Sequence, residues 1–417
     1  MRAAAAARDG AGPWLTRWMK ADRVANDARG WTANLALFRV VFVAGVALPA
    51  ALHTLTWPTA FPFPWLALAD VALLGLALLG ALTRWSLAGA AAISLVLATL
   101  PLGESPASPF PPAVAWLLAL LAAGPSGHYL SVDAAWAAIR RADRGQVDPA
   151  APDWSGLLTL RYAWGLLGLL HLGAGLGGVD TATQLAWSPR PGAGLVLGSL
   201  AVSVFELLFL PLVFIRAARP ALLVGVAAIQ VGQGLAQGHS LNIGSGGLLL
   251  SHAGLVDWTA AARALGRRRG RAPILVFYDG GCGFCRRAIG ILRSVDLLDG
   301  VEPVVGLSGD ARRRRHPEIT DEMLAHDVWA VDGSHAWSGY AAYRIIAARV
   351  PVLWPLVPLL ALPPVAWVGQ RVYRRVADSR DCRLPPASSP PPESPPPTPL
   401  WIHAVGILAL AGLGWLG

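Results

Sequence analysis

The sequence predicts a polytopic α-helical membrane domain followed by a smaller α/β domain that lies in water. Of the 417 residues, 54% are hydrophobic and only 14% are charged, whereas an ordinary soluble domain carries about 25% charged residues. Mean hydropathy is +0.49. Between residues 272 and 350 the long apolar runs give way to short apolar strands that alternate with amphipathic helical patterns.

The membrane domain is predicted from apolar runs of the length that a bilayer requires. A helix crosses the hydrocarbon core with about 20 mainly apolar residues. Eight such runs lie in the first two thirds of the chain, and a ninth extends from Leu400 to Leu416. The eight predicted spans are 34–53, 63–82, 85–101, 111–124, 157–177, 194–215, 220–237 and 241–258.

The net charge of +9 follows the pattern that membrane topology imposes. Cations precede the first span and follow the second, fourth, sixth and eighth, whereas the loop after the fifth carries only Arg190. By the positive-inside rule, the N-terminus and the α/β domain lie in the cytoplasm. We therefore expect a multi-pass protein of a bacterial-type inner membrane, with the lipid bilayer as a partner and no nucleic-acid partner.

Composition also divides the chain into segments. The first includes an amphipathic stretch, 13–30, that is typical of an interfacial helix. A proline-rich run near the end is typical of a semi-rigid spacer. The predicted segments are 1–33 (cytoplasmic), 34–260 (membrane domain), 261–271 (basic linker), 272–383 (α/β domain), 384–399 (spacer) and 400–417 (last transmembrane helix).

Within 272–383 the order of elements is strand, helix, strand, helix, hairpin and helix. The run 272–278 predicts a buried strand and 282–298 an amphipathic helix. A hairpin is expected to turn at Asp332 and Gly333. This is the element order of a thioredoxin-like fold. The apolar run 351–369 contains five prolines, so we expect a bent helical pair packed on this domain rather than a span.

Two cysteines, Cys282 and Cys285, lie where the first strand passes into the first helix. A thiol at a helix N-terminus lies near unsatisfied backbone N–H groups, which stabilise the thiolate. Arg286 adds positive charge beside it. We expect Cys282, at the more exposed first position, to be the nucleophile and Cys285 to resolve the mixed disulfide.

Neighbouring residues shape this turn. Gly280, Gly281 and Gly283 permit a tight backbone and close approach of a substrate, and Phe284 lies between the cysteines. Asp279 holds the turn or relays a proton. A metal reading stays open, but a zinc site lacks a second pair of cysteines because Cys382 stands alone. No cofactor is required by the thiol chemistry itself.

The motif "FYDGGCGFC" (277–285) resembles the DCC family of thiol-disulfide oxidoreductase-like proteins, named for its Asp, Cys and Cys. The segments "VWAVDGSHAWSGYAAYR" (328–344) and "VYRRVADSRDCR" (372–383) are similar to the hairpin and the arginine-rich end of that family. The resemblance implies a redox-active Cys282–Cys285 centre, with Asp279 as the aspartate of the motif.

Polar side chains in the membrane domain are further candidates, since they are costly in lipid and often functional. We expect Asp70 and Glu206 to face the bundle interior, either paired with a cation or protonated. His171 and His252 are expected to bond between helices or to take part in chemistry. Arg39 and Arg161 are expected to snorkel towards predicted cytoplasmic ends.

The membrane domain resembles the HTTM family, which includes vitamin K-dependent gamma-carboxylases. The matching segments are "NLALFRVVF" (34–42), "HLGAGLGGVD" (171–180) and "SLNIGSGG" (240–247). Those carboxylases carry a lysine where this chain has Gly177 and Gly178, and Lys20 is the only lysine here. Carboxylase activity is therefore not expected, but the resemblance leaves open a bound quinone or other lipid-soluble molecule.

These patterns predict a membrane-bound thiol–disulfide oxidoreductase that works with a redox partner protein or a small thiol. The membrane domain would supply a docking site or a lipid-soluble partner. The alternative is a non-catalytic transporter or scaffold whose CxxC pair binds a metal or is vestigial.

Overall fold

The computed structural model divides the chain into two compact units, which are described separately. The helical unit comprises Met1–Gly127, Asp153–Trp258 and Pro397–Gly417, and the sheet unit comprises His128–Pro152 and Thr259–Pro396. The residues that the structure describes are 22, 27–55, 64–99, 112–147, 154–186, 193–236, 249–268, 272–305, 316, 318–379 and 399–416.

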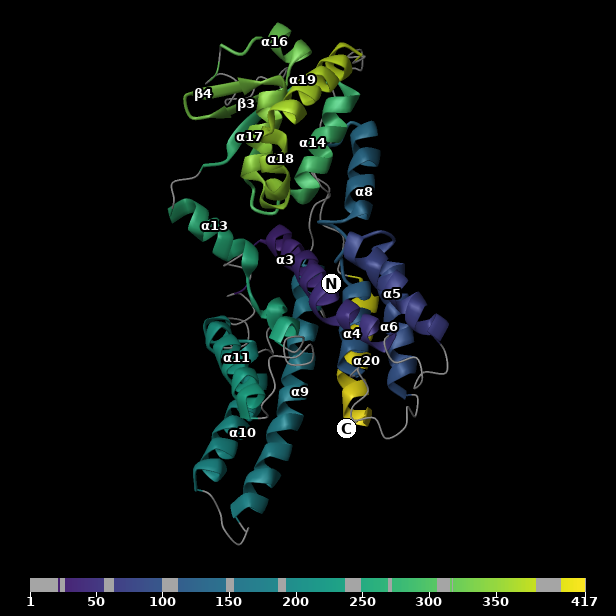
Figure 1. Cartoon of the computed structure of the whole chain (residues 1–417), viewed down its shortest axis with the longest axis vertical. Coiled ribbons are helices and arrows are strands. Elements are labelled where there is room, and N and C mark those ends of the chain that lie inside the picture. The colour runs from purple at the N-terminus through teal and green to yellow at the C-terminus, as the bar shows by residue number, and fades with distance from the viewer. Residues whose placement is uncertain are drawn as a thin grey trace, which may run out of the picture. The chain divides into compact units, whose positions relative to one another are not determined.

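The helical unit is built from apolar helices around a core of Trp, Phe, Leu and Ala side chains. Its two longest helices, α9 and α10, run side by side (Figure 1). The helix α20 packs against α7 and α9, so the end of the chain belongs to this unit. The elements are α3 (Ala28–Phe42), a π-helical turn (Val43–Ala47), α4 (Leu48–Leu55), α5 (Pro64–Leu79), α6 (Thr83–Thr99), α7 (Pro112–Ala123), α9 (Ser155–Ala186), α10 (Ala193–Val213), α11 (Arg219–Ala236), a 3₁₀ turn (His252–Leu255) and α20 (Leu400–Leu416).

Three helical stretches in the described chain are long and apolar enough to cross a membrane. They are Ala28–His53, Ser155–Gln184 and Gly194–Val213. The helices α5, α6, α7 and α20 are apolar but shorter. Of the predicted span 241–258, residues 241–248 lie outside the described chain; the described part contains a 3₁₀ turn, His252–Leu255, followed by extended Val256. The remaining spans and their sidedness stay predictions.

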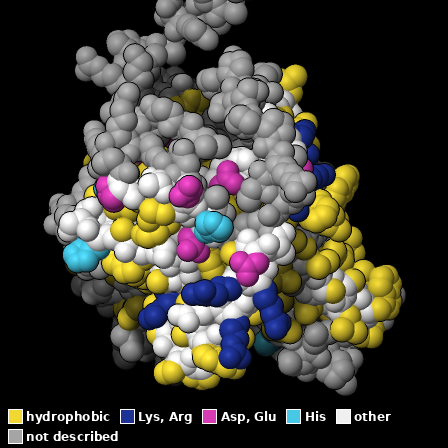
Figure 2. Space-filling model, turned by 90° about the horizontal axis from the view of Figure 1, so that it is seen from above, with side chains coloured by type: hydrophobic (Ala, Val, Ile, Leu, Met, Phe, Trp, Pro, Cys, Tyr) yellow, Lys and Arg dark blue, Asp and Glu magenta, His cyan; other side chains and the backbone are white. Residues whose placement is uncertain are grey.

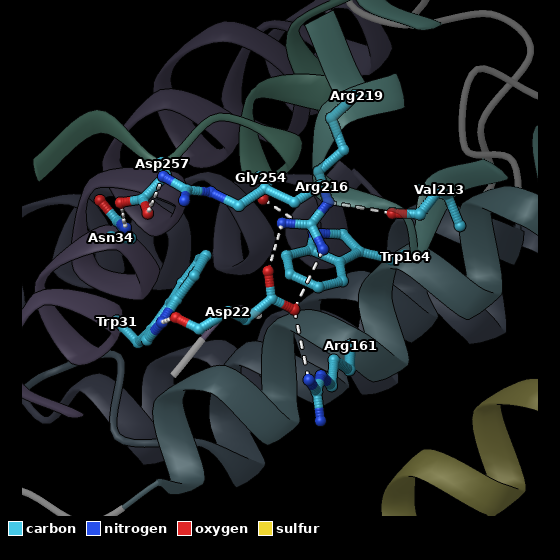
Figure 3. A network of polar contacts seen from close by, with 10 residues as sticks. All are labelled: Asp22, Trp31, Asn34, Arg161, Trp164, Val213, Arg216, Arg219, Gly254 and Asp257. Carbon is cyan, nitrogen blue, oxygen red and sulfur yellow. Dashed lines mark hydrogen bonds and ion pairs between the residues drawn. The ribbon is translucent and has the colours of Figure 1, made fainter. Parts of the chain in front are cut away.

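A buried network of charges lies within the helical unit (Figure 3). The carboxylate of Asp22 accepts two hydrogen bonds from Arg219, at 3.1 and 3.2 Å, and a third from Arg161 at 3.2 Å. The Arg219 guanidinium also lies 3.8 Å from the centre of the Trp164 ring. Most of the predicted interfacial helix, 13–30, lies outside the described residues, but Asp22 is buried in this network.

Arg39 differs from its prediction. Its side chain is fully buried, and its Nη1 donates to the carbonyl oxygen of Ser126 at 2.8 Å. Snorkelling is therefore wrong for Arg39, because the guanidinium hydrogen-bonds inside the unit.

The sheet unit contains a four-stranded mixed sheet in the order β2-β1-β3-β4. The central strand β1 (Ile274–Tyr278) pairs in parallel with β2 (Val301–Val305) and antiparallel with β3 (Trp329–Asp332), which forms a hairpin with β4 (His335–Ser338). Gly333 turns the hairpin at a positive φ of 59°, as predicted. The helices are α8 (Val132–Asp143), α13 (Trp258–Arg268), α14 (Gly283–Val295), α16 (Asp321–His326), α17 (Gly339–Arg349), a 3₁₀ turn (Pro351–Leu356), α18 (Val357–Ala361) and α19 (Pro363–Asp378).

Successive side chains of β1 point to opposite faces of the sheet, and apolar residues pack on both faces. Ile274, Val276 and Tyr278 pack with the cysteines and with residues of α14 and α17. Phe277 packs on the other face with Leu324 of α16 and other apolar residues. The CxxC pair is thus part of the larger core of this unit.

Candidate functional site

The CxxC pair begins the helix α14 directly after the central strand. Cys282 is the N-cap residue, with extended backbone (φ −80°, ψ 115°). Its Sγ accepts a hydrogen bond from the backbone N–H of Cys285 at 3.4 Å. A sulfur in this position satisfies one of the N–H groups that the first helical turn leaves without a partner. The same contact favours a negative charge on that sulfur.

Asp279 and Gly280 shape the turn that precedes Cys282. The Oδ1 atom of Asp279 accepts a hydrogen bond from the backbone N–H of Gly281 at 2.8 Å, and the Asp279 carbonyl accepts from the N–H of Cys282 at 3.2 Å. This is an Asx turn. A Cβ on Gly280 would lie 2.5 Å from Val305 in β2, so close packing against the neighbouring strand requires glycine here.

Both sulfur-bearing side chains are buried. Cys282 and Cys285 are each only 1% exposed and are not joined by a disulfide. The expectation that Cys282 occupies the more exposed position is therefore wrong, because the first helical turn is packed into the sheet unit's core. Between them, Phe284 is 46% exposed, and it is the large apolar side chain that this turn presents at the surface.

Arg286 is buried beside the cysteines and connects two segments far apart in sequence. Its Nη1 donates to the carbonyl oxygen of Gly280 at 2.8 Å, and its Nε donates to that of Ala142, at the end of α8, at 3.1 Å. The predicted positive charge beside the thiols is present. Through these two hydrogen bonds to backbone oxygens, the Arg286 side chain connects the CxxC turn to α8.

The helix α8 is the part of this site that sequence reasoning missed. It lies within the range 34–260, yet it packs along α14 in the sheet unit (Figure 1). Ala138 lies 3.4 Å from the position of a Cβ on Gly290, and Arg287 pairs with Asp143 at 2.6 Å. One signal could have found it, since a stripe of small apolar residues at a spacing of four indicates a packed helix face. These residues are Ala134, Ala138 and Ala142, all buried.

Among the described residues, no group of three or more His, Cys, Asp or Glu side chains is placed to hold a metal ion. Cys382 lies outside the described residues.

Three of the predicted polar residues of the helical unit come together in a buried chain. The Nδ1 atom of His171 in α9 bonds to the Oε2 atom of Glu206 in α10. The Nε2 atom of His171 lies 2.8 Å from that of His252. Ser251 Oγ lies 3.3 Å from the second nitrogen of His252. The His171 ring also stacks on Phe209, with 3.8 Å between ring centres.

Asp70 is separate from this chain. Its side chain is fully buried in α5, and both carboxylate oxygens lack a hydrogen-bond partner among the described residues. Asp70 is predicted to be either paired with a cation or protonated. Among the described residues, no cation is hydrogen-bonded to its carboxylate. The Glu206 carboxylate is hydrogen-bonded to the His171 imidazole, and its protonation state stays a prediction.

A comparison with family models gives a match within the sheet unit. Residues 276–383 match the family described as DCC1-like thiol-disulfide oxidoreductase. No curated protein and no solved structure matched the chain. The resemblance of the helical unit to HTTM proteins stays a prediction. The matched range begins inside β1 and includes Asp279, Cys282 and Cys285, so residues 276–383 are similar to the DCC1-like thiol-disulfide oxidoreductase family.

Proposed function

We propose that the chain is a membrane-bound thiol–disulfide oxidoreductase whose redox centre is the Cys282–Cys285 pair. The observation that carries this proposal is the N-cap position of Cys282, whose sulfur accepts the N–H of Cys285 at 3.4 Å. It occurs within the matched DCC1-like domain. The strand order β2-β1-β3-β4, with a cysteine pair after the central strand, is that of thioredoxin-like folds.

The reaction exchanges two thiols for one disulfide. The Cys282 thiolate attacks a disulfide of the partner, forms a mixed disulfide and releases one partner thiolate. Cys285 then attacks the Cys282 sulfur, which releases the second partner thiolate and closes the Cys282–Cys285 bond. Two electrons and two protons leave the chain in this direction. Because both cysteines are 1% exposed, a partner reaches Cys282 only when the turn around Phe284 opens.

The helical unit supports a place in a bacterial-type cytoplasmic membrane. Three described stretches are long and apolar enough to cross it, and the alternation of cationic loops favours a cytoplasmic sheet unit. The partner of the thiols is then a cytoplasmic redox protein or a small thiol.

A lipid-soluble quinone is proposed as the second redox partner. In this coupling the thiol exchange runs in reverse: a partner dithiol reduces the Cys282–Cys285 disulfide, and the pair closes again as the quinone takes up its two electrons and two protons to form the quinol. The buried chain Glu206–His171–His252 supports this pairing, because imidazole and carboxylate groups in hydrogen-bonded contact can pass protons. These residues would deliver protons and would not themselves be oxidised.

The first experiment measures the redox equilibrium of the full-length protein in detergent. A Cys382→Ser variant is equilibrated in graded glutathione buffers, quenched with an alkylating agent and weighed by mass spectrometry. A reversible two-electron transition, absent from the matched Cys285→Ser/Cys382→Ser variant, supports the oxidoreductase. Thiols that never pair across the range would contradict it.

The same preparation tests the non-catalytic alternative. Stoichiometric zinc that remains through purification and is lost on Cys282→Ser would favour a metal-binding transporter or scaffold. The full chain is required, because α8 completes the sheet unit from outside residues 272–383.

A further inference from the structure

The last helices of the sheet unit form an unusually exposed apolar layer. The 3₁₀ turn Pro351–Leu356, α18 and α19 contain no buried residue. The pair Pro351–Ala361 and Pro363–Asp378 bends by 104°. Large hydrophobic side chains nevertheless dominate its surface, with Trp354 52% and Trp367 55% exposed. The other exposed members are Val352, Leu356, Leu359, Leu362, Val368 and Val372.

This layer is exposed although its inner side is fixed to the domain. The Tyr340 hydroxyl of α17 donates to the carbonyl oxygen of Leu360 at 3.1 Å, and a Cβ on Gly369 would lie 2.3 Å from the Tyr340 ring. The Tyr373 hydroxyl accepts the backbone N–H of Val328 at 3.2 Å. Because these contacts hold the helices in place, the outward direction of the apolar side chains is a property of the folded domain.

Cations share the outer side of α19 with the apolar residues. At 100° per residue, Trp367, Arg371 and Arg375 lie within one helical face, opposite to Tyr373. The Arg371 guanidinium lies 3.4 Å from the centre of the Trp367 ring. Figure 2 shows cationic side chains gathered beside apolar ones on one face of the molecule. Three arginines and one acidic residue, Asp378, lie between 351 and 378.

These features fit the surface of a membrane better than its interior or a protein partner. The 104° bend prevents one straight crossing. Tryptophan prefers the level of the lipid headgroups, and arginine beside it is attracted to anionic headgroups. The chain on both sides of the domain also leads into apolar helices, through α13 and to α20.

We propose that residues 351–378 are a membrane-docking surface that inserts its apolar side chains into the headgroup region of an anionic bilayer. This inference rests on the proposed membrane location of the helical unit but not on the redox chemistry. Docking would fix the orientation of the CxxC domain against the lipid surface through α17.

The test places an environment-sensitive fluorophore on the full chain in nanodiscs. All three cysteines are first replaced by serine, and single labelling sites are introduced by Leu359→Cys, Val372→Cys and, as a control, Glu322→Cys at an exposed position of α16. Nanodiscs contain phosphatidylcholine and phosphatidylglycerol, with or without bromine atoms on the acyl chains. We expect brominated lipid to remove most of the emission at 359 and 372 and to leave the emission at 322 unchanged.

Charge is tested with Arg371→Gln/Arg374→Gln/Arg375→Gln, which we expect to reduce the quenching in anionic nanodiscs. If the emission at 359 and 372 does not respond to brominated lipid, these positions do not contact acyl chains and the docking surface is overturned. The conclusion is the same whether the fluorophores lie in water or beneath a protein segment. A chain that fails to incorporate into nanodiscs would instead remove the membrane premise. Neither result depends on the thiols, so failure of the redox proposal is recognised separately.

Discussion

Arg286 and Ala142 are joined by a hydrogen bond from the guanidinium Nε to the backbone oxygen, at 3.1 Å across 144 residues of sequence. Through its Nη1 the same side chain holds Gly280, two residues before Cys282. The position of the thiol turn therefore depends on a helix that is encoded among the predicted transmembrane segments.

Arg286→Gln is expected to loosen this connection. The carbonyl oxygens of Gly280 and Ala142 would lose charged donors in a buried site, at a cost of about 1–3 kcal/mol each where no replacement is found. We expect faster alkylation of the two cysteines under native conditions, measured by mass spectrometry. The matched control is Arg287→Gln. Its ion pair with Asp143 is about half exposed, so its loss should change stability by no more than about 1 kcal/mol.

The two roles of Asp279 are separated by Asp279→Asn and Asp279→Ala. Asparagine keeps the oxygen that accepts the Gly281 N–H but removes the carboxylate that could relay a proton. From the observed turn we expect Asp279→Asn to retain the thiol midpoint and the rate of exchange. Asp279→Ala removes the oxygen that accepts the Gly281 N–H, so its free energy of unfolding should fall by about 1 kcal/mol. An exchange rate that falls sharply for the asparagine variant, with its fold intact, would favour the relay instead.

Burial of the thiols predicts that opening limits their reaction. At low concentrations of a small alkylating agent, the rate for Cys282 should be far below that of an exposed cysteine and should rise in mild denaturant. Phe284→Ala removes the exposed ring from the turn while leaving the cysteines in place. We expect the Phe284→Ala variant to be alkylated faster than the wild-type protein, with the same number of alkylated cysteines by mass spectrometry. Native alkylation as fast as that of the unfolded chain would contradict the buried geometry.

The His171–Glu206 contact can be measured by a double-mutant cycle. Glu206→Leu alone leaves His171 without its carboxylate in an apolar bundle, and His171→Phe alone leaves the carboxylate without its imidazole. The double variant should lose less free energy of unfolding than the two single variants lose in sum, with a coupling of about 0.5–2 kcal/mol for a polar pair between apolar helices. Thermal unfolding in detergent is the measurement. Additive losses would show that the pair does not interact.

Asp22 provides a comparable test in the buried charge network. Asp22→Ala removes the carboxylate from Arg219, whose side chain is 3% exposed, and leaves a buried guanidinium with fewer acceptors. We expect a clear loss of thermal stability, on the order of 3 kcal/mol. Asp22→Asn keeps one oxygen acceptor and should lose less. Equal stability of the wild-type and alanine proteins would show that the network does not hold the unit together.

The sheet unit was largely predictable because its signals are local. The strand 274–278, the CxxC helix start and the Asp332–Gly333 hairpin each depend on a few neighbouring residues. Turn chemistry and apolar alternation specify such elements without knowledge of distant partners. The predicted bend in the helical pair at 351–369 is likewise confirmed, at 104°, since its prolines interrupt a straight helix; that the pair does not span a membrane stays a prediction.

Long-range packing was not predictable in the same way. Nothing near Cys282 in the sequence indicates that α8 closes over α14, because the two helices are separated by more than a hundred residues. The burial of Cys282 follows from its packing with β1 and the larger core of the sheet unit. The meeting of His171, Glu206 and His252 also depends on the register between helices, whereas hydropathy reports only that each residue lies in an apolar run.

The position of α8 also imposes an order on biosynthesis. Ala142 leaves the ribosome 144 residues before Arg286, which corresponds to about 7–30 s at usual rates of translation. During that interval the alanine stripe of α8 has no α14 to cover it. A nascent chain therefore keeps the buried face of α8 uncovered until α14 has been made, and the thiol turn reaches its buried arrangement only after that.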